Sequence, residues 1–403
     1  MHTGHYFLNK KNICYNCTLE RNAMNTLLKY PGGKNKELKY ILPNLPMIIN
    51  RFFEPFVGGG AVYFNMDSSI DKYINDKSHE LINFYQNVSD QNNDFLSLLK
   101  EIDDNLISIQ SFVENQKKYL IHVYTNFSLD DKTPLSEIIV QFIDDNYKSI
   151  ISKNSTVVDN ENYKKFLKKN VLDKYKRIKN LEIKHGKLEK DEDVINNIET
   201  GFYAALYTFL RELFNDYIEH NITKAQHAAL YFYIREYCYS SMFRYNKYGK
   251  FNVPYGGMSY NHKFMTKKIE YLKNEKVVSF LKNTKIENMD FYDFLEKHQL
   301  QSDDFLFLDP PYDSEFSTYA NNTFELDDQT RLANYLIKEC PANFMLVIKN
   351  TDYIQKLYPE GIVTSSGKQL NISAFDKNYL VSFRNRNDKK AEHLLITNYE
   401  LGL

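Results

Sequence analysis

The chain has 403 residues, of which 43% are hydrophobic, and it carries 51 basic and 52 acidic side chains. This length and apolar content are typical of a globular protein of one elaborated domain or two domains, and they exclude a disordered or fibrous chain. Because the net charge is close to zero, any nucleic-acid partner has to be bound by a local basic surface rather than by the overall charge.

The first 23 residues precede the first recognisable element and lack the apolar core of a signal peptide. We expect residues 1–23 to form a disordered extension, with Met24 as the functional start. No window holds 18 apolar residues, so we expect no membrane span and a cytoplasmic protein. A zinc site would need a second cysteine pair beside the single CxxC, so we expect no metal; the cysteines are Cys14, Cys17, Cys238 and Cys340.

Residues 51–83 have the pattern of a βαβ unit with a glycine turn. An apolar strand over 52–57 meets three glycines, a helix is expected to begin at Ala61, and a second strand ends at Asp76. Glycines at such a turn let a ligand approach the backbone, and a helix N-terminus behind them favours polar or anionic groups. A carboxylate after the second strand suits the hydroxyls of a ribose. The glycine turn alone is equally compatible with a tight turn that binds nothing.

Residues 93–200 are polar and contain a long amphipathic helix over 163–187. Its apolar residues recur at helical spacing. Between Lys164 and Lys187 there are ten basic and two acidic residues, and 10 minus 2 leaves a charge of +8. The run predicts either a solvated helix face or a surface that contacts phosphates. The apolar positions are Leu167, Val171, Tyr175, Ile178 and Leu181.

Residues 201–243 continue the helical pattern, which ends at the segment RYNKYGKFNVPYGG, residues 244–257. Its glycines, its proline and its interleaved basic and aromatic residues indicate an exposed loop or hairpin. Such donors and rings suit contact with DNA, although a plain surface hairpin has the same composition.

An α/β pattern returns after this segment, with a strand and helix over 285–297 and an apolar strand that ends in DPPY. A helix, a strand over 343–350 and a last strand over 391–400 follow. Two α/β pieces therefore flank a helical insertion, and the sheet is expected to combine segments that are distant in sequence. The expected boundaries are 24–92 and 271–403 for the two catalytic parts and 93–270 for the insertion and target-recognition region.

The tetrapeptide Asp309-Pro310-Pro311-Tyr312 follows the buried strand FLFL. In open α/β sheets, ligands bind at the carboxyl ends of the strands. The amino group of a nucleobase is a poor nucleophile, and hydrogen-bond acceptors around it favour the geometry that frees its lone pair. The Asp309 carboxylate and the Pro310 carbonyl could be those acceptors, held by two rigid prolines. Tyr312 supplies a stacking face for a base that has left its duplex.

Five segments together resemble the Dam-type DNA adenine methyltransferases, in the family's order of cofactor motif, recognition region and catalytic motif. The resemblance covers residues 27–90 and 240–400 and leaves 93–200 without a counterpart. It implies an α/β fold, a Rossmann-like S-adenosylmethionine-dependent methyltransferase sheet with a mainly helical inserted target-recognition domain. The segments are LLKYPGGK (27–34), EPFVGGGAVYF (54–64), INDKSHELINFY (74–85), RYNKYGKFNVPYGG (244–257) and DPPY (309–312).

The resemblance assigns roles to individual residues. It implies that Lys34 pairs with the carboxylate of S-adenosylmethionine, that Asp76 binds its ribose, and that Asp309 lies between the methyl donor and the target amino group. The implied catalytic residues are Asp309, Pro310, Pro311 and Tyr312. The implied cofactor contacts are Tyr30, Lys34, Phe56, Gly58, Gly60, Asp76, Asp290, Phe291 and Asp309. The implied DNA contacts are Arg244, Tyr245, Asn246 and Lys247.

The implied activity is transfer of a methyl group from S-adenosylmethionine to the amino group of a flipped adenine in double-stranded DNA. The sulfonium already activates the methyl group, so no metal or covalent intermediate is required. The implied role is restriction-modification or Dam-like, and a cognate restriction endonuclease is a candidate partner. We expect the enzyme to be a monomer. The alternatives are a cytosine amino-methyltransferase and a non-catalytic DNA-binding protein of the same fold.

Overall fold

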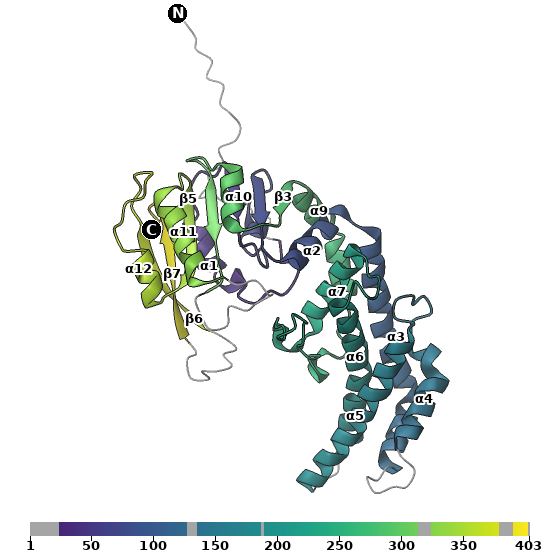
Figure 1. The fold of residues 1–403 in the computed structure, drawn as a ribbon. Helices are drawn as coiled ribbons and strands as arrows, with labels where there is room; N and C mark the ends of the chain where they lie inside the picture. Colours follow the sequence, from purple (N-terminus) through teal and green to yellow (C-terminus); the bar gives the residue numbers. More distant parts are fainter. Residues whose placement is uncertain (1–23, 127–134, 187–188, 313–323, 379–389, 402–403) are drawn as a thin grey trace, which may run out of the picture. The chain divides into compact units, whose positions relative to one another are not determined.

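The computed structural model (Figure 1) describes residues 24–126, 135–186, 189–312, 324–378 and 390–401. The chain divides into two compact units. Unit 1 consists of Gly32–Ile82 and Ser279–Leu403 with the described part of Met1–Thr26, and unit 2 consists of Leu27–Pro31 and Asn83–Val278. The expected N-terminal extension, residues 1–23 with its two cysteines, lies outside the described residues.

Unit 1 is built on a seven-stranded sheet with the strand order β3-β2-β1-β4-β5-β7-β6. The five strands from β3 to β5 are parallel, whereas β7 is antiparallel to both β5 and β6. The sheet therefore combines segments from both ends of the chain, as the sequence predicts. The strands are β1 (Arg51–Glu54), β2 (Asp71–Asn75), β3 (Thr284–Glu287), β4 (Phe305–Leu308), β5 (Asn343–Lys349), β6 (Asn371–Asn378) and β7 (Lys390–Thr397).

The strand order reverses between β1 and β4. The chain leaves β1 toward β2 on one side, and it leaves β4 toward β5 on the other. Connections that diverge in this way open a crevice at the carboxyl ends of the two strands, which is where open α/β sheets bind ligands. Glu54 ends β1 and Asp309 directly follows β4, so both carboxyl side chains belong to this reversal point.

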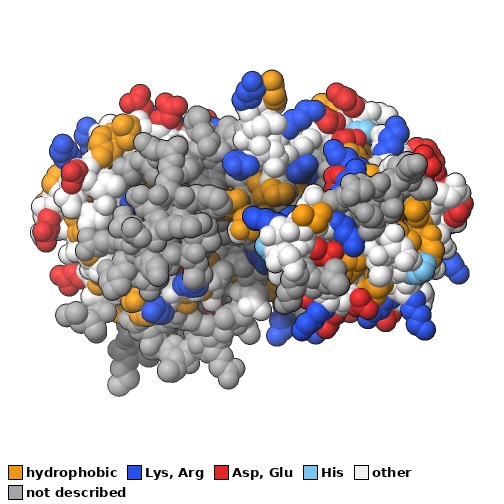
Figure 2. All heavy atoms as spheres, turned by 90° about the horizontal axis from the view of Figure 1, so that it is seen from below, with side chains coloured by type: hydrophobic (Ala, Val, Ile, Leu, Met, Phe, Trp, Pro, Cys, Tyr) orange, Lys and Arg blue, Asp and Glu red, His pale blue; other side chains and the backbone are white. Residues whose placement is uncertain are grey.

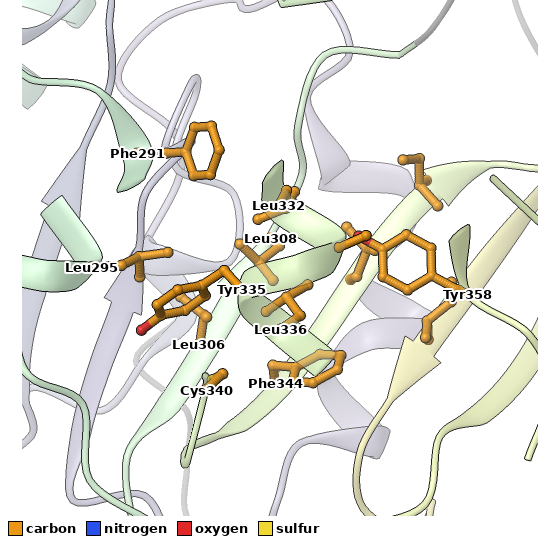
Figure 3. Close-up of a cluster of buried hydrophobic side chains, with 14 of the residues drawn as sticks. Phe291, Leu295, Leu306, Leu308, Leu332, Tyr335, Leu336, Cys340, Phe344 and Tyr358 are labelled. Atoms are coloured by element: carbon orange, nitrogen blue, oxygen red, sulfur yellow. The ribbon is translucent and has the colours of Figure 1, made fainter. Parts of the chain in front are cut away.

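The central strands β1, β4 and β5 are buried on both faces, which explains the uninterrupted apolar run of β4. On one face, Leu306 and Leu308 join a cluster from α10 (Phe291–His298) and α11 (Leu326–Lys338), as Figure 3 shows. The neighbouring Phe305 and Phe307, which point to the other face, are also at most 1% exposed. A strand covered on both sides needs apolar residues at every position, so alternation disappears.

One expected element is wrong. The helix expected from Ala61 is a single 3-10 turn, η3 (Tyr63–Asn65), and the chain then turns at Asp67. The residues 61–64 are all buried, so this segment has no polar face to present to water. The glycine turn is therefore followed by a 3-10 turn and not by the N-terminus of an α-helix.

Short helices complete unit 1. They are the α-helices α1 (Leu38–Ile41) and α12 (Asp352–Leu357) and the 3-10 turns η1 (Lys34–Lys36) and η2 (Leu42–Asn44). The division between the units falls inside α2 (His79–Asp90) and α9 (Glu275–Lys282).

Unit 2 is mainly helical, and α3, α4, α5 and α6 run side by side in it (Figure 1). Of the apolar positions predicted for the helix over 163–187, four are buried in α5 and Leu181 is half-buried. No helix of the described residues is long and apolar enough to cross a membrane. The elements are α3 (Asn93–Asn126), α4 (Leu135–Ile150), α5 (Glu161–His185), α6 (Asp191–Asn215), α7 (Lys224–Tyr237), α8 (Thr266–Leu272), η4 (Tyr239–Ser241) and η5 (Met258–Tyr260).

Lys72 on β2 is a buried lysine that closes the turn before its strand. Its Nζ donates to the carbonyl oxygens of Asp67 at 3.3 Å, Ser68 at 3.1 Å and Ile70 at 2.6 Å. Burial lowers the pKa of Lys72 to about 8. The unfolded chain, with a lysine pKa of about 10.4, therefore binds more protons than the folded chain between these values. The contribution of Lys72 to the free energy of unfolding rises with pH across this window.

Lys72→Met removes this titrating group. As the pH rises from 7.5 to 10.5, we expect the free energy of unfolding of the wild type to increase, relative to that of Lys72→Met, by up to about 3 kcal/mol. Urea unfolding curves of both proteins at the two pH values measure this shift. Buried tyrosines that titrate at high pH affect both proteins alike and cancel. Equal pH dependence of the two proteins would show that the Lys72 amine keeps its ordinary pKa in the fold.

Candidate active site

A buried lysine and the first residue of the DPPY segment form the centre of the site in unit 1. The Lys34 side chain is 3% exposed, and its Nζ forms an ion pair with the carboxylate of Asp309, which is 20% exposed. Lys34 Nζ also donates to the Gly32 carbonyl and to the Tyr312 hydroxyl, each at 3.0 Å. The fold thus brings residues 34, 309 and 312 into mutual contact, and Lys34 forms an ion pair with Asp309 of the same chain.

The Tyr312 side chain is held at both ends. Its hydroxyl faces Lys34 and Asp309, and its ring lies edge-on to His393 with 5.2 Å between the ring centres. Burial raises the pKa of Tyr312 well above its usual range, and the Asp309 carboxylate adds to this shift. The phenol is therefore a neutral hydrogen-bonding group.

The turn after Asp309 is fixed from α11. The Gln329 side chain, which is 1% exposed, donates from Nε2 to the Pro311 carbonyl at 2.8 Å. Pro310 is buried and Pro311 is exposed. With two prolines and one clamped carbonyl, the peptide that follows Asp309 has little conformational freedom.

Glu54 places a second carboxyl group at the strand-reversal point. It is 2% exposed, and its Oε2 has no hydrogen-bond partner among the described residues. Burial raises the pKa of Glu54 well above its usual range, and the nearby Asp309 carboxylate raises it further. The Glu54 side chain thus carries a buried oxygen without a partner among the described residues, which is costly unless a ligand group binds it.

The glycine turn lies against Asp76. The Gly58 amide donates to Asp76 Oδ2 at 3.0 Å, and the Ser78 amide donates to Asp76 Oδ1 at 2.9 Å. Gly58 and Gly60 have φ values of +48° and +69°, which side chains disfavour. The turn is therefore shaped by glycine conformations and by a carboxylate that receives two backbone donors.

Aromatic rings and an ion pair lie next to this turn. The rings of Phe56 and Phe291 are 5.4 Å apart between centres. Asp290 caps α10 by accepting from the Tyr292 amide at 2.9 Å, and it accepts from Arg331 Nη2 at 2.9 Å. The Arg331 guanidinium also lies over the Phe291 ring at 5.0 Å. Asp290 and Phe291 are thus fixed by α11.

Tyr30 belongs to unit 2. Its ring lies 4.5 Å from the guanidinium carbon of Arg235, a buried residue of α7 that also lies 3.7 Å from the Phe243 ring centre. Arg235 Nη1 has no hydrogen-bond partner among the described residues. The described contacts of the guanidinium are therefore aromatic faces and the Tyr231 hydroxyl, to which Arg235 Nε donates at 3.3 Å.

The segment 244–257 contains a short hairpin in unit 2, with an antiparallel bridge between Tyr245 and Phe251. The Asn246 Oδ1 accepts from the amides of Tyr248 at 2.9 Å and Lys250 at 3.1 Å, so this side chain closes the turn. Lys247, within this turn, and Arg244, before it, are both exposed. This geometry is compatible with both interpretations of the segment, a plain surface hairpin and a hairpin that contacts DNA.

Sequence reasoning missed three residues of the site. Glu54 had an available signal, because it is a carboxylate at the carboxyl end of an apolar strand, like Asp309. Gln329 and Arg331 lie within an ordinary amphipathic helix, α11, and carry no local signal. Their roles depend on contacts with Pro311 and Asp290, which only the fold brings near.

Comparisons with known proteins identify a family that matches most of the chain. A family model described as D12 class N6 adenine-specific DNA methyltransferase matches residues 30–203 and 187–371. The chain is 34% identical over 209 residues to the Type II methyltransferase M.CviBI of Paramecium bursaria Chlorella virus NC1A, which covers 50% of this chain and 75% of the viral protein.

Two further relatives extend the comparison. The Type II methyltransferase M.MjaIII of Methanocaldococcus jannaschii is 27% identical over 345 residues, 82% of this chain and 86% of that protein. The Retron Ec67 DNA adenine methylase of Escherichia coli is 31% identical over 167 residues, 41% of this chain and 53% of that protein. Because the family model matches most of the chain, the protein belongs to the D12 class of N6 adenine-specific DNA methyltransferases.

Proposed function

We propose that the protein transfers a methyl group from S-adenosylmethionine to the exocyclic amino group of an adenine flipped out of double-stranded DNA. The observation that carries this proposal is the position of Asp309 at the strand-reversal point, in one unit with the glycine turn and Asp76. An adenine methyltransferase needs a ribose-binding carboxylate and an acceptor for the target amino group at one edge of the sheet.

The residues of unit 1 fit S-adenosylmethionine. The Glu54 Oε2 is a buried polar atom that lacks a partner among the described residues, so the site has hydrogen-bonding capacity to offer a polar ligand. Asp76 would bind the ribose hydroxyls of the cofactor, Asp290 and Phe291 would border its adenine, and Lys34 would bind its carboxylate. Phe56, Gly58 and Gly60 would border the methionine part. When bound, the cofactor supplies an electrophilic methyl group on a sulfonium.

Asp309 and the Pro310 carbonyl would accept hydrogen bonds from the adenine amino group and stabilise the positive charge that develops on its nitrogen during transfer. Tyr312 would border the flipped base. The Tyr312 hydroxyl donates a hydrogen bond to the Asp309 carboxylate, and the Lys34 ammonium forms an ion pair with it. These two contacts orient the carboxylate before the base binds. A carboxylate that is already oriented lowers the activation barrier of methyl transfer, because less conformational entropy is lost on reaching the transition state.

Residues 93–270 would serve as the target-recognition region in double-stranded DNA. Arg244 and Lys247 are exposed and suit phosphates, and Tyr245 and Asn246 would lie near the target. Several relatives are named Type II methyltransferases, which supports a restriction-modification role with a cognate endonuclease. We also propose that the enzyme is cytoplasmic and acts as a monomer on its DNA.

Gln329 would act as a positioning residue. Gln329→Met keeps the side-chain length but removes the donor to the Pro311 carbonyl. We expect kcat to fall by about tenfold, the effect of one hydrogen bond worth about 1.4 kcal/mol, with unchanged affinities for DNA and cofactor. Single-turnover methylation and equilibrium binding measure the two quantities. Gln355→Met on α12 is the matched control, and equal kcat values for the Gln329 variant and the wild type would remove this role.

The proposed reaction is tested by transfer of a labelled methyl group from S-adenosylmethionine to duplex DNA. We expect label in the DNA that depends on the protein and is released as N6-methyladenine after digestion of the DNA to nucleosides. Label in N4-methylcytosine, or none in any nucleoside, would contradict the proposal.

A further inference from the structure

Eight of the nine Lys and Arg residues of α5 in unit 2 fall into two groups that the sequence does not separate, and the ninth, Lys174, is half-buried. Three lysines are neutralised by acidic partners: Lys164 by Glu161 at 2.9 Å, Lys168 by Asp144 at 2.7 Å and Lys179 by Glu182 at 3.3 Å. Five other basic residues are exposed and form no ion pair with another described residue. These five form what we call the basic stripe: Lys165, Lys169, Lys176, Arg177 and Lys184.

The basic stripe lies on one side of α5. At 3.6 residues per turn, its members fall within about a third of the helix circumference. The buried residues of α5, from Tyr163 to Glu182, lie on the opposite side. Asp173 is exposed within the same sector, so five basic minus one acidic residue leaves a charge of +4. Figure 2 shows that Lys, Arg, Asp and Glu side chains are intermixed on the face it views.

The basic stripe and the hairpin are attached to the same helix. Three residues of α6 bind hairpin carbonyl oxygens: Tyr207 and Arg211 donate to Val253 at 2.9 and 3.0 Å, and Asn215 donates to Phe251 at 3.0 Å. The hairpin is therefore fixed to the C-terminal half of α6.

α5 packs along α6 in the opposite direction. The Tyr163 ring of α5 lies 5.5 Å from the Phe209 ring of α6, between ring centres. Val171 of α5 packs against Gly201 of α6, where a Cβ atom would lie 3.1 Å from the Val171 Cα atom. Lys165 thus begins the stripe at the level of α6 that holds the hairpin. From there the stripe runs to Lys184 over about 28 Å, at 1.5 Å per residue.

We propose that the basic stripe binds the sugar-phosphate backbone of duplex DNA that flanks the methylated site. This inference rests on the proposed function, because it takes the hairpin as the part that lies near the target. Phosphates along one strand are about 3.4 Å apart, so a stripe of this length spans about eight of them. The contact positions the enzyme without reading bases.

The test compares two duplexes that share an unmodified target adenine and its sequence context, one with about four base pairs on each side and one with about twelve. The stripe variant carries Lys169→Gln, Lys176→Gln and Arg177→Gln, all at exposed positions. The control variant carries Lys282→Gln, Lys285→Gln and Lys338→Gln in unit 1, which removes equal charge at or near the amino ends of strands. Fluorescence titrations at several salt concentrations give the affinities.

We expect the wild type and the control variant to bind the long duplex at least tenfold more tightly than the short one, and the stripe variant to lose this advantage. The slope of log affinity against log salt on the long duplex should fall by about 0.9 for each phosphate that the stripe variant no longer neutralises. Methylation of the short duplex should be equal in all three proteins, which reports the proposed function separately.

Three results would overturn the inference. One is an unchanged salt slope and affinity of the stripe variant on the long duplex. Another is a loss of affinity that is not specific to the basic stripe, because the stripe variant shows it equally on both duplexes or the control variant shows it too. The third is normal DNA binding with lost binding to phosphatidylserine vesicles, which would assign the stripe to a membrane surface.

Discussion

Asp309→Ala is expected to reduce methyl transfer by at least about 100-fold, or about 2.7 kcal/mol in the barrier, which is the loss typical of removing one preorganised group that stabilises developing charge. The carboxylate directly follows β4 at the strand-reversal point, with Lys34 and Tyr312 already on it. Its proposed partner is the adenine amino group, so DNA affinity should stay close to that of the wild type. Single-turnover rates and DNA titrations measure both effects.

Asp303→Ala is the matched control for Asp309→Ala. Asp303 is an exposed aspartate that precedes the same strand, so its loss changes charge at the far end of β4. Because Asp309→Ala leaves the buried Lys34 without its ion-pair partner, Asp309→Asn serves as a second variant that keeps an oxygen beside the ammonium. Asp309→Asn should give an intermediate rate, since its amide oxygen still accepts one hydrogen bond. Retention of more than a tenth of the rate by Asp309→Ala, a change below about 1.4 kcal/mol, would contradict the assigned role.

Asp76→Ala is expected to weaken S-adenosylmethionine binding by at least tenfold. Charge-assisted hydrogen bonds to a carboxylate contribute about 1.5–3 kcal/mol each, and a ribose offers two hydroxyls. The same substitution removes the acceptor of the Gly58 and Ser78 amides, so the glycine turn also loses a support. Isothermal titration calorimetry with the cofactor measures the change.

Asp71→Ala is the control for this effect, because Asp71 begins the strand that Asp76 follows. Asp76→Asn should give an intermediate affinity, since an amide still accepts one hydrogen bond but lacks the charge. If Asp76→Ala binds the cofactor as the wild type does, Asp76 is not part of the cofactor site.

Much of unit 1 could be predicted from sequence because its central strands β1, β4 and β5 are buried on both faces. Such strands are rich in apolar residues, and a carboxylate that ends one, as Asp309 does, is visible without a fold. The pattern failed at Ala61, where a buried segment of mixed apolar residues looks like the start of a helix but is one turn long. Periodicity cannot separate these cases when a segment is buried on every side.

The contacts inside the site could not be predicted, because they join residues that are distant in sequence. Lys34 meets Asp309 from the other end of the chain, and Gln329 reaches Pro311 from a neighbouring helix. The basic run of α5 shows the same limit. Its charges are countable in the sequence, but Lys168 is neutralised by Asp144 of α4, a pairing set by how the helices pack.

The most direct test of the proposed function is to map modified bases in DNA from cells that express the wild-type protein or Asp309→Ala. We predict N6-methyladenine at one fixed sequence context in the wild-type DNA and none above background in the variant. N4-methylcytosine in place of N6-methyladenine, equal methylation by the two proteins, or unmodified DNA in cells that contain the folded wild-type protein would contradict it.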